Sequence, residues 1–292
     1  MTQRNTKRQS PTPPPLQKHE GASDFDETWS YRSLIGMLTY LARNTRPDIE
    51  YAVYQCARFQ SNPKKPHANA IKRIVRYLLG TKDQGVSFTP NGEMDHFECF
   101  VDADFAGNYS QETCEDPTSV KSRTGCVIKY AGCSINWFSR LQTEIALSTT
   151  EAEYMALSLA AREVLPLREL VVELKDILQI PQAKLKIRCT LFEDNKGAEE
   201  LAKVPKNRPR TKHITTKYHH FREHVKNGTL LVKRVETTEQ LADIFTKALA
   251  RQPLEYLRKQ IMGWTAILSH GHENEETFYK MTKTFLGHKC DH

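Results

Sequence analysis

Four acidic residues stand at positions from which they could converge on one site: Asp102, Glu153, Asp194 and Asp243. Asp102 follows the alternating run 96–101, and Asp194 closes the run 185–194, so each lies at the end of a predicted strand. Ligands of a mixed α/β sheet bind at the carboxyl ends of its parallel strands, so two neighbouring parallel strands would bring Asp102 and Asp194 together. Glu153 and Asp243 lie in predicted helices that could return them to the same edge.

Such a cluster predicts metal-dependent chemistry. Carboxylates within a few ångströms of one another repel and raise each other's pKa values unless divalent cations neutralise them. The candidate ligands are all oxygens, which favours two Mg²⁺ ions, with Mn²⁺ possible, over Zn²⁺. Two such ions about 4 Å apart are suited to in-line hydrolysis of a phosphodiester. The alternative is structural: Asp102 and Asp104 could simply begin a loop, since Asp is common where strands end.

The pattern around these acids predicts an α/β fold with a mixed five-stranded sheet flanked by helices. Alternating or apolar runs indicate its strands: 96–101, 123–130, 134–138, 185–194 and 228–235. Residues 85–92 suggest a hairpin with the first strand. The capping-box sequence from Ser148 to Glu151 opens a long helix, and further helices are expected near 29–46, 47–59, 66–80, 196–202 and 239–249.

Composition divides the chain into four parts. The polar, proline-rich residues 1–27 are expected to be a disordered leader. Residues 28–83 form a small helical segment, 84–250 the α/β domain, and 251–292 a helical tail.

The totals over 292 residues limit the class of protein. No apolar run approaches the roughly 20 residues of a membrane helix, and no secretory signal is recognisable, so no membrane partner is expected. The seven cysteines are scattered without C-x-x-C pairs, which indicates reduced thiols in an intracellular protein. A net charge of +7 is compatible with a polyanionic partner.

Eight short motifs occur in an order that resembles the Pol polyprotein of copia-type LTR retrotransposons. They lie at 31–42, 45–49, 76–81, 101–107, 121–125, 146–156, 193–197 and 241–247. The resemblance covers roughly residues 28–264 and takes in the end of the reverse transcriptase and its ribonuclease H domain. Residues 28–83 resemble only the helical thumb or connection, so we expect a fragment or degenerate copy whose palm and fingers would be a separate partner.

The resemblance implies a ribonuclease H-like fold and endonucleolytic cleavage of the RNA strand of RNA–DNA hybrids. It makes Asp102, Glu153, Asp194 and Asp243 the metal-binding catalytic carboxylates. Asp104 and Glu151 are expected beside this ligand set, Glu151 as the acid of the capping box. The protein is expected to act inside the cell, in cytoplasmic virus-like particles, in the nucleus, or in both.

Contacts with the hybrid are expected from polar and basic side chains. The candidates are Arg123, Thr124, Arg140, Gln142, Asn195, Lys206, Arg208, Arg210 and Lys212. The last four belong to the basic stretch 203–226, which fits an element that grips a nucleic-acid backbone. The alternative is that these side chains only solvate the surface.

The sequence offers three alternatives to parts of this interpretation. The chain could be a catalytically silent retrotransposon remnant that only binds nucleic acid. A transposase or integrase of the same broad fold is disfavoured, because those enzymes carry their Glu last, whereas here Glu153 comes second. A Zn²⁺ site among His270, His272, His288, Cys290 and His292 is a weak alternative.

Overall fold

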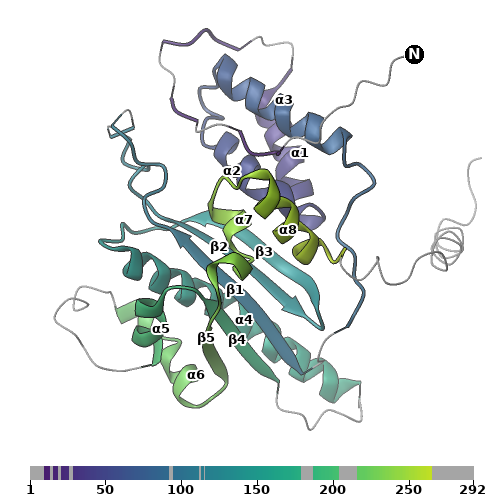
Figure 1. Cartoon of the computed structure of the whole chain (residues 1–292), viewed down its shortest axis with the longest axis vertical. Coiled ribbons are helices and arrows are strands. Elements are labelled where there is room, and N and C mark those ends of the chain that lie inside the picture. The colour runs from purple at the N-terminus through teal and green to yellow at the C-terminus, as the bar shows by residue number, and fades with distance from the viewer. Residues whose placement is uncertain are drawn as a thin grey trace, which may run out of the picture.

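The computed structural model describes residues 10–13, 16–18, 21–25, 29–91, 95–111, 113–114, 116–178, 187–203 and 216–264. Its centre is a five-stranded sheet with the order β3-β2-β1-β4-β5 (Figure 1). The strands are β1 (His96–Asp104), β2 (Arg123–Tyr130), β3 (Cys133–Leu141), β4 (Arg188–Glu193) and β5 (Leu230–Arg234). The first three form an antiparallel meander, while β4 and β5 run parallel to β1. The predicted mixed sheet flanked by helices is confirmed.

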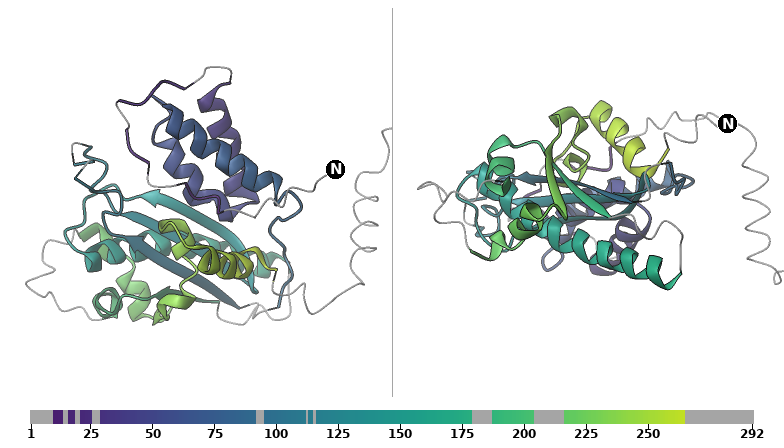
Figure 2. Two further views of the ribbon diagram at one scale, coloured as in Figure 1. Left: turned by 45° about the horizontal axis from the view of Figure 1, so that its top comes forward. Right: turned by 90° about the horizontal axis from the view of Figure 1, so that it is seen from below.

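Helices cover both faces of this sheet (Figure 2). The long helix α4 (Thr149–Ile177) packs on one face, where its small residues Ala152, Ala156 and Ala160 are fully buried against β1 and β4. The same face also receives α5 (Lys196–Lys203) and α6 (Arg222–Lys226). The other face carries α7 (Asp243–Thr246) and α8 (Arg251–Met262), which pack on Val127 and Trp137.

A helical module precedes the sheet. It comprises α1 (Tyr31–Asn44), the short 3-10 turn Pro47–Ile49, α2 (Glu50–Ala57) and α3 (Lys65–Leu79), in agreement with the predicted helices. Their apolar faces share one core. Polar contacts fix this module to the sheet domain: the Trp137 indole N–H donates to the Ala42 carbonyl at 2.8 Å, and Arg258 donates to the Tyr77 hydroxyl at 2.7 Å.

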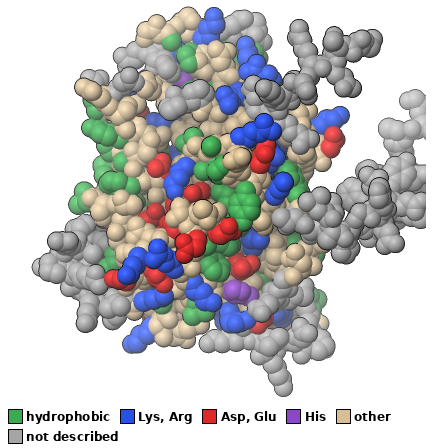
Figure 3. Space-filling view, in the orientation of Figure 1, with side chains coloured by type: hydrophobic (Ala, Val, Ile, Leu, Met, Phe, Trp, Pro, Cys, Tyr) green, Lys and Arg blue, Asp and Glu red, His purple; other side chains and the backbone are tan. Residues whose placement is uncertain are grey.

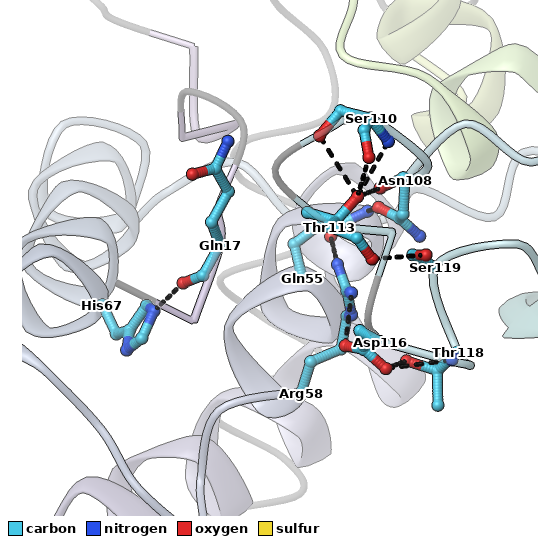
Figure 4. A network of polar contacts seen from close by, with 10 residues as sticks. All are labelled: Gln17, Gln55, Arg58, His67, Asn108, Ser110, Thr113, Asp116, Thr118 and Ser119. Carbon is cyan, nitrogen blue, oxygen red and sulfur yellow. Dashed lines mark hydrogen bonds and ion pairs between the residues drawn. The ribbon is translucent and has the colours of Figure 1, made fainter. Parts of the chain in front are cut away.

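The loop after β1 is tied to the same module. Figure 4 shows Gln55 on α2 beside Asn108, with the amide nitrogen of Gln55 3.3 Å from Asn108 Oδ1. The guanidinium of Arg58 lies 3.8 Å from Asp116, whose carboxylate also accepts the Thr118 backbone N–H. The loop therefore stabilises the contact between the helices and the sheet.

The sequence prediction is wrong in the region expected to form a hairpin. Residues 85–91, all described, form no strand. The backbone N–H of Ser87 instead donates to Met262 at the end of α8, and that of Asn91 donates to Ala131 in the turn between β2 and β3. The reason is that β1 already has a partner strand on each side, so it has no free edge for a hairpin.

The described part of the predicted leader makes defined contacts, and the last helices differ from expectation. The described residues between 10 and 25 lie against α3: Arg73 donates to the Ser10 carbonyl at 2.9 Å, and His67 lies 2.6 Å from the Gln17 carbonyl (Figure 4). The helix expected at 239–249 is reduced to α7, because Gln240 adopts an extended backbone. The predicted tail contributes α8 to the core, and its remainder beyond 264 lies outside the described residues.

In the described part of the chain, no helix is both long enough and apolar enough to cross a bilayer.

Glu50 provides a test of the contact between module and sheet. This side chain is 1% exposed, and burial raises its pKa to about 7 although Arg43, Arg140 and Arg123 oppose the shift. The unfolded chain ionises near pH 4.5, so the free energy of unfolding falls as pH rises from there to about 7. Glu50→Gln removes this pH-dependent loss of stability. The difference in the free energy of unfolding between the variant and the parent should therefore shift in favour of the variant by on the order of 2 kcal/mol between pH 5 and pH 8.

Urea unfolding at several pH values measures this difference. Glu163→Gln is the matched control, because Glu163 lies in a more exposed ion pair with Arg140. Its stability relative to the parent should change little over the same range. Parallel pH profiles for Glu50→Gln and the parent would contradict the assignment.

Gly125 on β2 tests the packing of α7. A Cβ at this position would lie 2.7 Å from Thr246 Cγ2 and 2.8 Å from the Ala242 carbonyl oxygen. We expect Gly125→Ala to lower the free energy of unfolding by roughly 1–3 kcal/mol, because α7 must move away from the sheet. Gly36→Ala is the control: Gly36 lies in α1 with open space around it, so alanine should be neutral or stabilise by about 0.5–1 kcal/mol. Equal stability of Gly125→Ala and the parent in urea would contradict this packing.

Candidate active site

The structure brings the predicted acids to one edge of the sheet. Asp102 lies near the end of β1, Asp194 follows β4, and the parallel register sets Phe100 opposite Phe192, two residues before each acid. Glu153 enters from the second turn of α4. One carboxylate oxygen from each of these three residues lies within 4.8 Å of the other two. Figure 3 shows acidic side chains gathered near the middle of the face of the molecule that it presents.

Asp243 joins the group from the opposite face of the sheet. It is the first residue of α7, and its Oδ1 accepts a hydrogen bond from Lys247 Nζ at 2.9 Å. The same ammonium donates to Asp102 Oδ1 at 3.2 Å. The four carboxylates predicted from the sequence therefore lie together, although among the described residues only the first three form a set with mutual spacing suited to one ion.

Asp102, Glu153 and Asp243 are held in an environment that opposes their ionisation. Asp102 is 1% exposed and Glu153 4%. Burial raises the pKa of Glu153 well above its ordinary value, and the charges of Glu193 and Asp102 raise it further. Burial likewise raises the pKa of Asp243 to about 6, with Asp102 adding to the shift. A nearby divalent cation would favour the ionised forms.

A fifth acid, Glu193, was not predicted to belong to the site. It is fully buried at the end of β4, and its Oε1 accepts the backbone N–H of Asn195 at 3.0 Å. Its Oε2, like Oε2 of Glu153, is buried without a hydrogen-bond partner in the described part of the chain. Strand alternation could have revealed it, because Glu193 shares a face of β4 with the core residues Cys189 and Leu191.

The donor set fits a hard divalent cation. Every candidate ligand atom is a carboxylate oxygen, which suits Mg²⁺ or Mn²⁺. The buried oxygens of Glu153 and Glu193 that lack protein donors are acceptors that such an ion could satisfy. The residues that would hold it are Asp102, Glu153 and Asp194, with Asp243 beside them.

Hydroxyl and amide groups orient the acids. The Thr246 hydroxyl donates to Asp102 Oδ2, and the Thr237 hydroxyl donates to Asp194 Oδ2 at 3.0 Å. Gln240 donates to the Val101 carbonyl, directly before Asp102, at 2.8 Å. The segment leading into α7 therefore fixes the end of β1 as well as Asp243.

The two acids expected beside the ligands have different positions. Glu151 accepts the Leu147 backbone N–H at 2.8 Å, and its own N–H donates to the Ser148 hydroxyl at 3.2 Å. It therefore stabilises the start of α4, as the capping sequence predicts. Asp104 ends β1 on the same face as Asp102, and burial together with the charge of Asp102 raises its pKa.

Three predicted nucleic-acid contacts need correction, because their side chains are interior. Arg123 is 1% exposed; its guanidinium lies 5.8 Å from the ring centres of both Tyr51 and Tyr54 and donates to Ser139. Thr124 is fully buried and accepts a hydrogen bond from Gln142 at 3.1 Å. Gln142 also donates to the Ala152 carbonyl on α4. None of the three side chains is available to a phosphate group.

The other predicted contacts fall into two groups. Arg140 is exposed at the edge of the sheet, where it pairs with Glu163 at 2.9 Å. Asn195 is half-buried, and its Oδ1 accepts the Ala198 N–H, which stabilises the start of α5. The remaining candidates, Lys206, Arg208, Arg210 and Lys212, lie outside the described residues, as does the weak His and Cys candidate zinc site.

Solved structures offer only a slight likeness, and no protein-family model matches the chain. The ribonuclease H1 called LC11-RNase H1, solved in complex with an RNA/DNA hybrid, aligns at 14% identity with a TM-score of 0.33, covering 51% of this chain and 93% of that structure. A likeness of this size does not indicate a function.

Sequence comparison is more informative. The chain is 37% identical over 233 residues to the retrovirus-related Pol polyprotein from transposon TNT 1-94 of Nicotiana tabacum, which is 80% of this chain and 16% of the relative. It is 36% identical over 250 residues to that from transposon RE2 of Arabidopsis thaliana, covering 86% of this chain and again 16% of the relative. The chain therefore spans a small part of these relatives. The resemblance read from its motifs is confirmed: the chain belongs with the retrovirus-related Pol polyproteins of copia-type transposons.

Proposed function

We propose that this chain is a metal-dependent ribonuclease H that hydrolyses the RNA strand of RNA–DNA hybrids during retrotransposon reverse transcription. The observation that carries the proposal is the convergence of Asp102, Glu153 and Asp194 within 4.8 Å at a sheet edge. The relationship to transposon Pol polyproteins supports it.

Different carboxylates of the chain would hold the two divalent ions. Asp102, Glu153 and Asp194 would hold one divalent ion, and Asp243 with Asp102 would help to hold a second. Bound ions of this kind activate water and stabilise the leaving oxygen in phosphodiester hydrolysis. Thr246 and Thr237 hold the carboxylates of Asp102 and Asp194 in place. Burial raises the pKa of Glu193, next to Asp194, well above its ordinary value, and a bound cation would favour its ionised form.

The proposal extends to partners and location. The substrate is an RNA–DNA hybrid, bound through its backbone and groove shape. A polymerase palm and fingers would act with this chain in synthesis, and the place of action would be inside the cell, in virus-like particles or in the nucleus. Arg140 remains the exposed candidate for a phosphate contact among the described residues proposed from the sequence.

Hydrolysis of a labelled RNA–DNA hybrid by the purified chain in Mg²⁺ tests the function. We expect cleavage of the RNA strand alone, abolished by chelation. Asp102→Asn and Glu153→Gln should lower the rate by on the order of 100-fold or more, because each removes a proposed ligand charge. Glu98→Gln is the control. Glu98 lies on β1 away from the carboxyl end of the strand, so this variant should cleave the RNA strand at the rate of the parent.

Absence of cleavage would support the alternative function, which is nucleic-acid binding without catalysis. A folded parent that binds hybrid but cleaves neither strand in Mg²⁺ or Mn²⁺ would overturn the enzymatic proposal. It would indicate a silent remnant that only binds nucleic acid. Cleavage that survives in both acid variants would place the catalytic site elsewhere.

A further inference from the structure

Lys247 lies inside the acidic cluster and was not predicted to be there. Its Nζ is 2.9 Å from Asp243 Oδ1 and 3.2 Å from Asp102 Oδ1. The two carboxylate side chains are 12% and 2% exposed, whereas the lysine side chain is 38% exposed. One ammonium therefore bridges two of the proposed metal ligands and also reaches solvent.

The ammonium divides the cluster into two unequal halves. On one side, Asp102, Glu153 and Asp194 have the spacing for a cation, and Glu153 Oε2 lacks a donor among the described residues. On the other side, Asp102 and Asp243 face each other across Lys247, so their charge is already partly neutralised. Asp102 is common to both halves and uses its second oxygen to accept the Thr246 hydroxyl.

We propose that Lys247 is a built-in counter-ion that fixes the order in which the cluster takes up divalent cations. The first ion binds at Asp102, Glu153 and Asp194, and the second binds between Asp102 and Asp243 only after the ammonium has moved out. This inference rests on the proposed function, because it takes these acids to be metal ligands.

The position of Lys247 suits such a displacement. The residue follows α7 with an extended backbone, at φ −123° and ψ 153°, so its side chain is not packed along a helix. A lysine ammonium is a compact, strongly hydrated charge on a flexible stem, and it can return to water when a divalent ion takes its place. Held between the acids, the ammonium stabilises the ion-free protein and competes with the second ion.

Binding of Mn²⁺ to the whole chain, followed by calorimetry and by the EPR signal of free Mn²⁺, tests the inference. The parent should bind one ion tightly and a second weakly. Lys247→Met and Lys247→Gln should bind the second ion at least about tenfold more tightly and leave the first within about threefold, because only the second site loses a competing charge. Both variants should also melt at a lower temperature than the parent without divalent ions, and recover on adding Mn²⁺.

Two further variants serve as controls. Lys203→Met removes the lysine of another i,i+4 ion pair, with Glu199 on α5, and should bind Mn²⁺ like the parent. Lys247→Arg keeps the charge and should resemble the parent. If the parent binds two ions and both neutral Lys247 variants show the same isotherm, the counter-ion inference is wrong while the proposed metal site stands. If the parent and Asp102→Asn both fail to bind Mn²⁺, the metal-dependent function itself is overturned.

Discussion

The mutual repulsion of buried carboxylates is the constraint on which this structure depends. Asp102, Glu153, Glu193 and Asp243 lose water on folding and face one another, so each makes ionisation of the next more costly. The fold tolerates this because β1, β4, α4 and α7 are held by contacts elsewhere. The sheet register and the apolar core of α4 supply the stability that the acidic edge lacks.

Much of this arrangement could be predicted from the sequence, because it follows from local patterns. Period-two runs ending in Asp102 and Asp194 predicted two strands, and the sequence from Ser148 to Glu151 predicted the start of the helix that carries Glu153. Short-range rules of this kind place each acid on its element. The rule that ligands gather at the carboxyl ends of parallel strands then brings them together.

The errors arise where distant parts of the chain decide the outcome. Arg123 was a predicted nucleic-acid contact, but Tyr51 and Tyr54 from the helical module cover its guanidinium. The expected hairpin failed because β4, whose residues lie 92 positions after their partners in the sequence, pairs with β1. The role of Lys247 could not be predicted either, because it depends on the strand position of Asp102 relative to α7.

Because aromatic side chains of α2 cover Arg123, the smallest stable fragment of this protein includes the helical module. Without α2 the Arg123 guanidinium would lose the rings of Tyr51 and Tyr54, and without α1 the Trp137 indole N–H would lose the Ala42 carbonyl. A truncated chain starting at β1 would thus expose a charged and aromatic patch that the intact chain conceals. The helical module therefore covers part of the sheet in the folded protein. We expect substitutions on α2 and on β2 to depend on one another during evolution.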